Sequence, residues 1–196
     1  MLNISLHSAS HVTMSVSKLL SRIVAHSSDR TVAGKSLASS LHDHTYGITS
    51  DPLTRFACIL SALIHDVGHE GVPNTQLIKE GSPLAKLYKQ QSVAEQNSVD
   101  VAWRLFMDDK YKELRSTICG SDAEMQRLRK LIVNSVMATD IMDKNLKNLR
   151  NARWDKSFSE KAIDENPFLT RNRKATVVIE HIIQASDVSV QLAFLA

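Results

Sequence analysis

Apolar residues recur at intervals of three and four along most of the chain, the spacing that keeps one face of an α-helix buried. This pattern predicts helices over about 12–24, 52–65, 92–106, 122–148 and 171–187. The chain has only six glycines and four prolines, and no pair of alternating segments indicates a sheet. We therefore expect an all-α fold, a compact multi-helix bundle.

Two of these helices begin with recognisable capping residues. Asp51 precedes Pro52, which places a favoured cap residue before a proline in the first turn. Ser92 is followed three residues later by Glu95, the spacing of a capping box. Both patterns predict where a helix starts.

Two polar segments separate the predicted helices. Residues 27–50 are rich in Ser, Asp and Thr and predict a long surface loop or insertion, and residues 151–166 form a second polar stretch. The trio His42, Asp43 and His44 lies in the first segment without an apolar frame. We interpret this trio as part of a solvated loop and leave it out of the candidate site.

Composition narrows the classes of function. The 24 basic and 21 acidic residues are spread along the chain, so no basic stripe indicates nucleic acid and no polybasic block indicates membrane contact. Cys58 and Cys119 have no CxxC spacing, which favours a reducing, cytoplasmic compartment. The sequence begins and ends abruptly within helical patterns, and we expect a piece of a larger protein.

The pair His65–Asp66 is the strongest chemical feature. It ends the apolar run 56–64 and is followed by His69. A buried helix that delivers imidazole and carboxylate groups into a small volume favours a metal site, since these ligands suit zinc and a carboxylate can also reach a harder ion. The alternative is that the pair only caps a core helix through hydrogen bonds.

Further acidic residues and histidines occur in or beside the other predicted helices. His7 and His11 are four residues apart and share a helix face. Asp140 and Asp187 each lie on an otherwise apolar helix, where a buried carboxylate needs a partner or a metal. Taken singly, an aspartate in such a position is more often a boundary residue in contact with water.

These residues resemble the catalytic domain of class I cyclic nucleotide phosphodiesterases, a branch of the HD-domain metallohydrolases. Residues 64–74 are similar to the family's HDxxHxGxxN block, 92–97 to SVxEN, 136–140 to LATD and 184–189 to AADxS. The resemblance implies that residues 1–196 are part of such a catalytic domain, an all-α bundle with its metal site between helices.

The resemblance also implies an activity and its cofactors. Members of the family hydrolyse 3′,5′-cyclic AMP or cyclic GMP to the 5′-monophosphate within larger signalling proteins. By similarity, His11, His65 and Asp187 are ligands of a tightly bound zinc ion. Asp66 is then the bridge to a second ion, magnesium or manganese.

Other roles follow from the same resemblance. His7 is the expected proton donor to the leaving oxygen, and Glu95 is the carboxylate that hydrogen-bonds it. A further group is expected to orient water or substrate around the metals: His69, Asn74, Thr139 and Asp140.

The register of the first histidine block has two solutions. Four-residue spacing makes His7 the donor and His11 the ligand, whereas residues 9–12 fit the family's AxxV, which places Ser8 at the ligand position and the donor outside the matched residues. The family's purine pocket lies downstream of Asp187, where this chain has nine residues, so the choice between cyclic AMP and cyclic GMP is not encoded here.

Two other hypotheses remain, namely a different HD-type nucleotide phosphohydrolase and a non-catalytic remnant with a regulatory or interaction role.

Overall fold

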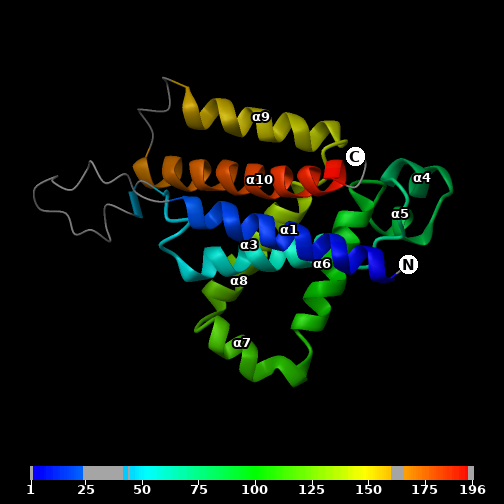
Figure 1. The fold of residues 1–196 in the computed structure, drawn as a ribbon, viewed down its shortest axis with the longest axis horizontal. Helices are drawn as coiled ribbons and strands as arrows, with labels where there is room; N and C mark the ends of the chain where they lie inside the picture. Colours follow the sequence, from blue (N-terminus) through cyan, green and yellow to red (C-terminus); the bar gives the residue numbers. More distant parts are fainter. Residues whose placement is uncertain (1, 24–41, 44, 160–165, 194–196) are drawn as a thin grey trace, which may run out of the picture.

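The computed structural model describes residues 2–23, 42–43, 45–159 and 166–193. In these ranges the chain forms helices and no strand, which confirms the predicted all-α class (Figure 1). The elements are α1 (Leu2–Arg22), α3 (Pro52–Ile64), α4 (Asn74–Lys79), α5 (Pro83–Leu87), α6 (Val93–Phe106), the 3₁₀ turn η2 (Asp109–Tyr111), α7 (Lys112–Ile118), α8 (Asp122–Met137), α9 (Lys144–Phe158) and α10 (Pro167–Ala193). None of the described helices is long and apolar enough to cross a bilayer.

Helix α3 lies at the centre of the bundle, in contact with α1, α6, α8 and α10. One side of α3 joins a core cluster with α1 and α10, and the other joins a second cluster with α6 and α8. The first cluster contains Val12, Val16, Leu20, Ile48, Cys58, Ala62, Ile179 and Ile182. The second contains Leu53, Ala57, Val99, Cys119, Leu128, Ile132 and Val136. Burial of both faces explains why the sequence of α3 is so apolar.

The start of α3 is as predicted. The carboxylate of Asp51 accepts a hydrogen bond from the backbone N–H of Leu53 at 3.2 Å, and Pro52 occupies the first helical position. The helix ends at Ile64, so that His65 is the first residue beyond its last turn. The buried faces of α3 therefore fix where His65 lies.

The predicted capping box of α6 is wrong. Ser92 has a positive φ of 37° and its side chain makes no capping hydrogen bond. The Oδ1 atom of Asn74 instead accepts the N–H of Ala94 at 2.9 Å, so a residue from α4 caps α6. Lys89 and Gln90 also have positive φ, at 53° and 61°, which turns the chain sharply before α6 begins.

The helix predicted over 122–148 is two helices. Helix α8 ends at Met137, and α9 begins at Lys144 after Asp143, whose carboxylate accepts the N–H of Leu146 at 2.9 Å. Apolar periodicity continued through the break and hid it. The break contains Ala138, Thr139 and Asp140, the last three residues of the block similar to LATD.

Other boundaries also differ from prediction. The polar stretch 151–166 is helical as far as Phe158, as part of α9. Thr45 and Ile48 are buried, so the last part of the predicted loop 27–50 packs against the core, and residues 24–41 lie outside the described residues. The short elements α4, α5, η2 and α7 were not predicted, because a few residues give too little periodicity.

Candidate functional site

His65 is buried at the end of α3 and faces two carboxylates. Its Nε2 atom lies 3.2 Å from Asp66 Oδ2 and 3.6 Å from Asp187 Oδ1. Its Nδ1 atom lies 2.8 Å from the carbonyl oxygen of Ala62, which can only accept, so Nδ1 carries a proton. In the neutral ring the lone pair of Nε2 therefore points toward the carboxylates.

The electrostatics of this group favour a cation at Nε2. Burial alone would lower the pKa of His65, but the neighbouring carboxylates of Asp187 and Asp66 outweigh burial and raise it to about 10. Burial likewise opposes ionisation of Asp66, yet His65 lowers the pKa of that carboxyl below its ordinary value. Two carboxylates and one buried imidazole thus require a positive charge between them, from a proton or from a metal ion.

The donor set fits a divalent metal ion. Nε2 of His65 is buried and has no properly aligned hydrogen-bond partner. Ligands about 2.0–2.2 Å from one zinc ion are roughly 3–3.5 Å apart, close to the spacings from Nε2 to the two carboxylates. Within the described part of the chain, no three His, Cys, Asp or Glu side chains form a completed metal-binding group. His65 with Asp66 and Asp187 is therefore an incomplete set of donors.

A second polar group is organised around Asn74. The Nδ2 atom of Asn74 donates to Glu95 Oε2 at 2.8 Å and to Asp140 Oδ2 at 3.3 Å. Burial raises the pKa of Glu95, and the nearby charge of Asp140 adds to this effect against the opposing hydrogen bond from Asn74. The other oxygen of Asp140 accepts the N–H groups of Met142 and Asp143. One amide thus holds two carboxylates side by side.

His69 links the two groups. Its ring is exposed, and its Nδ1 atom accepts the N–H of Gly71 at 2.9 Å. Its charge would lower the pKa of both Asp66 and Glu95, so His69 lies within electrostatic range of both carboxylates. Residues predicted from separate sequence blocks are therefore brought into one neighbourhood.

Two residues that the sequence did not single out as site residues hold the segment between α8 and α9. Gln184 Nε2 donates to the carbonyl oxygen of Ala138 at 2.8 Å, and an Arg150 nitrogen donates to that of Asp140 at 3.2 Å. Thr139 uses its hydroxyl to donate to the carbonyl of Val136 at 2.7 Å. Gln184 is one helical turn before Asp187, which is the signal that could have identified it.

The first histidine block remains a prediction. Both histidines belong to α1, but the side chain of His7 lies outside the described residues, while that of His11 is exposed. Figure 1 places the start of α1 at the end of the bundle where α10 also finishes. The backbone arrangement is therefore compatible with a contribution from α1 to the site.

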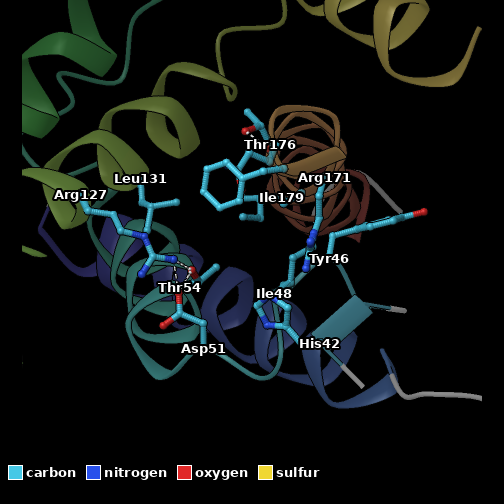
Figure 2. A pocket seen from close by; sticks show the side chains of 14 residues that line it. His42, Tyr46, Ile48, Asp51, Thr54, Arg127, Leu131, Arg171, Thr176 and Ile179 are labelled. Atoms are coloured by element: carbon cyan, nitrogen blue, oxygen red, sulfur yellow. Dashed lines mark hydrogen bonds and ion pairs between the residues drawn. The ribbon is translucent and has the colours of Figure 1, made fainter. Parts of the chain in front are cut away.

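The His42–Asp43 segment lies elsewhere. His42 Nδ1 is 2.9 Å from Ser50 Oγ, and Asp43 forms an ion pair with Arg171 at 2.9 Å, whereas residue 44 lies outside the described residues. His42 and Arg171 line a cavity of about 520 Å³ beside Asp51, at the start of α3 (Figure 2). The His65 group lies at the other end of that helix. Leaving the trio out of the candidate site is consistent with this position.

The fold and the His65 group together define an all-α domain with imidazole and carboxylate donors at the end of its central helix. Residues 14–193 match the family described as 3′5′-cyclic nucleotide phosphodiesterase, and the chain belongs to this family. The matched range begins after His7 and His11, so it leaves their roles untested.

Individual relatives agree with this family. The chain is 31% identical over 115 residues to a dual specificity calcium/calmodulin-dependent 3′,5′-cyclic nucleotide phosphodiesterase 1 from Drosophila melanogaster, covering 59% of this chain and 13% of that protein. It is 40% identical over 86 residues to the human protein of the same description, 1C, covering 44% of this chain and 12% of that protein.

A solved structure shares the fold. The phosphodiesterase domain of Salpingoeca rosetta rhodopsin phosphodiesterase superposes with a TM-score of 0.55 at 20% identity. The superposition covers 88% of this chain and 52% of that domain. The chain therefore spans about half of the solved domain and a smaller share of the curated relatives.

Proposed function

We propose that this chain is part of a catalytic domain that hydrolyses 3′,5′-cyclic AMP or cyclic GMP to the 5′-monophosphate. The observation that carries the proposal is the buried Nε2 atom of His65, which faces Asp66 and Asp187 without an aligned hydrogen-bond partner. Membership of the phosphodiesterase family supplies the class of substrate. The chemistry requires a donor set of this kind, because a phosphodiester anion must be neutralised before water attacks it.

We assign His65 and Asp187 as residues that would hold a zinc ion, and Asp66 as a residue that would help to hold both this ion and a second one, magnesium or manganese. When bound, the two cations would neutralise the phosphodiester and acidify the attacking water. The chain prepares the imidazole for this role, because the Ala62 carbonyl fixes the proton on Nδ1 and leaves Nε2 available. The break after α8 places Asp140 within reach of Asn74.

The remaining roles follow the family pattern. His7 would donate a proton to the leaving oxygen, with Glu95 as its carboxylate partner and His11 as a further zinc ligand. His69, Asn74, Thr139 and Asp140 would orient water and substrate. The hydrogen bonds from Asn74 to both carboxylates support this grouping. A cytoplasmic location within a larger signalling protein, where Cys58 and Cys119 stay reduced, completes the proposal.

The test measures zinc content and hydrolysis of cyclic AMP and cyclic GMP by the purified chain with added magnesium or manganese. We expect bound zinc and turnover in the wild type. His65→Ala and Asp187→Asn should lose the zinc and at least about 100-fold of kcat/KM, because each removes a donor at Nε2 or beside it. Asp155→Asn, at an exposed position of α9, is the matched control and should retain both.

Two outcomes would contradict the proposal. A folded wild-type chain that binds zinc but hydrolyses neither cyclic nucleotide would be a non-catalytic remnant. Release of phosphate from monoesters, without cleavage of cyclic diesters, would indicate a different HD-type phosphohydrolase. Helical content by circular dichroism shows in each case that the protein tested is folded.

A further inference from the structure

A cavity of about 320 Å³ lies between α9 and α10, next to the break that follows α8. Lys147, Arg150 and Asn151 of α9 line one wall, and Gln184 of α10 lines another. Ligand sites in proteins commonly enclose about 300–1,000 Å³, so this cavity has room for a small organic ligand. Neither the sequence motifs nor the proposed hydrolysis uses these side chains as ligands.

The lining of the cavity carries positive charge. Its lining, all of it in the described part of the chain, includes Lys147 and Arg150 and no Asp or Glu. Among the described residues, neither cation has an ion-pair partner, and the acidic neighbour on α10, Glu180, is paired with Arg153. Two cations that are not engaged in ion pairs attract an anion of matching charge.

The larger cavity beside Asp51 offers a contrast. Arg127 is paired there with Asp51 and hydrogen-bonded to Thr54 (Figure 2). Arg171, which also lines this cavity, is paired with Asp43. A ligand anion would have to displace a carboxylate from either guanidinium. The cavity between α9 and α10 imposes no such cost.

Arg150 is already oriented for binding. One of its nitrogens donates to the carbonyl oxygen of Asp140 at 3.2 Å, which fixes the guanidinium over the cavity and leaves other N–H groups for a ligand. Asn151 and Gln184 add amide groups to the lining. A prepositioned donor lowers the entropy lost when a ligand binds.

The cavity also contains an aromatic surface. Trp154 is 46% exposed and lies one turn beyond Arg150 on α9. Its ring is backed by Phe158 at 4.8 Å and by His181 at 5.3 Å between centroids. A supported, half-exposed indole is a suitable surface for stacking a planar ring.

We infer that this cavity binds a nucleoside monophosphate, with its phosphate on Lys147 and Arg150 and its base against Trp154. A phosphate monoester carries a charge between about −1.5 and −2 at pH 7, which matches the two cations. The base supplies the planar ring that the indole accommodates. The inference does not depend on the proposed hydrolysis, because it concerns binding alone.

The test uses the fluorescence of Trp154 in the full chain. The chain has two tryptophans, so Trp103→Phe leaves Trp154 as the sole indole. Adenosine 5′-monophosphate is titrated in the presence of a chelator, which prevents both turnover and phosphate binding to metal ions. We expect saturable quenching that weakens as salt rises. Inorganic phosphate and adenosine, each lacking half of the ligand, should bind at least tenfold more weakly.

Charge-neutralising variants locate the site. Lys147→Gln and Arg150→Gln should each weaken binding by about tenfold or more, because a charge-assisted hydrogen bond is lost. Lys144→Gln removes the same charge from α9 outside the cavity and should change affinity by less than twofold. Lys147 is exposed, so its replacement does not threaten the fold.

Three results would overturn the inference. The first is the absence of saturable quenching by adenosine monophosphate in the folded chain. The second is unchanged affinity in both Lys147→Gln and Arg150→Gln, which would move the ligand to another surface. The third is equal affinity for inorganic phosphate and the nucleotide, which would exclude a contribution from the base.

Discussion

At the scale of single residues, Asn74 holds the carboxylates of Glu95 and Asp140 next to each other. Its amide nitrogen donates to both Glu95 and Asp140, and its oxygen accepts the N–H of Ala94. Without the amide between them, two partly buried carboxylates would repel each other. Asn74 therefore ties the start of α6 to the break after α8 and keeps Glu95 beside the site.

Glu95→Gln should stabilise the protein at neutral pH. Burial raises the pKa of Glu95 in the folded state, so the ionised form costs stability. This cost is absent below the pKa of the unfolded chain and grows as pH rises through the higher folded pKa. Glutamine has no ionised form, so the melting temperature of the variant should exceed that of wild type at pH 7, and the difference should vanish near pH 4.

Thermal melts from pH 4 to pH 8 measure this difference. Glu113→Gln, at an exposed position of α7, is the matched control and should show no such trend. A Glu95→Gln variant that is less stable than wild type by the same margin at every pH would show that hydrogen-bond geometry, and not charge, determines the effect.

At the scale of elements, α3 connects the core to the site. Its start is held by Asp51, which accepts from Leu53 and Thr54 and pairs with Arg127 on α8. Its end presents His65. A helix fixed at its first residue by α8 and along both faces by the core clusters places its last residue with little freedom.

Asp51→Ala should destabilise the fold by about 1–2 kcal/mol at pH 7, the usual effect of losing a cap. Burial opposes ionisation of Asp51, but hydrogen bonds from Thr54 and Arg127 outweigh it and lower its pKa. The stabilisation is therefore present above the unfolded pKa and is lost as pH falls through the folded pKa.

Urea unfolding at pH 7 and at low pH checks the effect of Asp51→Ala. The loss of stability should be smaller at low pH, where the wild-type carboxyl is protonated. Asp155→Ala, at an exposed position, should change stability by less than about 0.5 kcal/mol. An equal loss at both pH values would mean that the charge of Asp51 is not what stabilises α3.

The helix boundaries were predictable from the sequence where the contacts that fix them are local. The cap of α3 was predictable because Asp51 acts on the next residues of the same segment. The start of α6 at Ser92 was also predicted, but the cap itself was not, because it comes from Asn74, twenty residues before Ala94. The break after α8 could not be predicted because the apolar spacing continues through it. The carboxylate of Asp140 accepts the N–H groups of Met142 and Asp143 and so stabilises the turn.

The candidate site was likewise predictable only where local sequence determines it. His65 and Asp66 could be selected from their position after an apolar run. The approach of Asp187 to His65 depends on how α10 packs against α3, which sequence spacing does not reveal. Arg150 acts on a backbone carbonyl, and this contact leaves no signature in the sequence, whereas Gln184 could be identified only from its place one turn before Asp187.

At the scale of the whole molecule, two core clusters share α3. Leu131 of α8 packs against both of them. Clusters joined by one helix and a common side chain should not unfold separately. The site at the end of α3 should therefore be lost in the same transition as the rest of the bundle.

Val16→Ala and Leu128→Ala test this cooperativity from opposite sides of α3. Leu128→Ala should cost about 2–5 kcal/mol, Val16→Ala about 2 kcal/mol, and the pair should be additive within about 0.5 kcal/mol. Circular dichroism and tryptophan fluorescence should follow one common midpoint in every variant. Leu149→Ala, at a position that is 61% exposed, is the control. Two separated midpoints would show that the clusters unfold independently.

The turn before α6 indicates where the stability of the protein could be increased. Lys89, Gln90 and Ser92 all hold left-handed backbone angles, which cost an L-residue roughly 1–2 kcal/mol each compared with a right-handed conformation. Natural selection retains adequate stability and does not maximise it. A combinatorial library at these three codons, screened for heat resistance, should therefore return glycine, the residue usually removed to strengthen a protein.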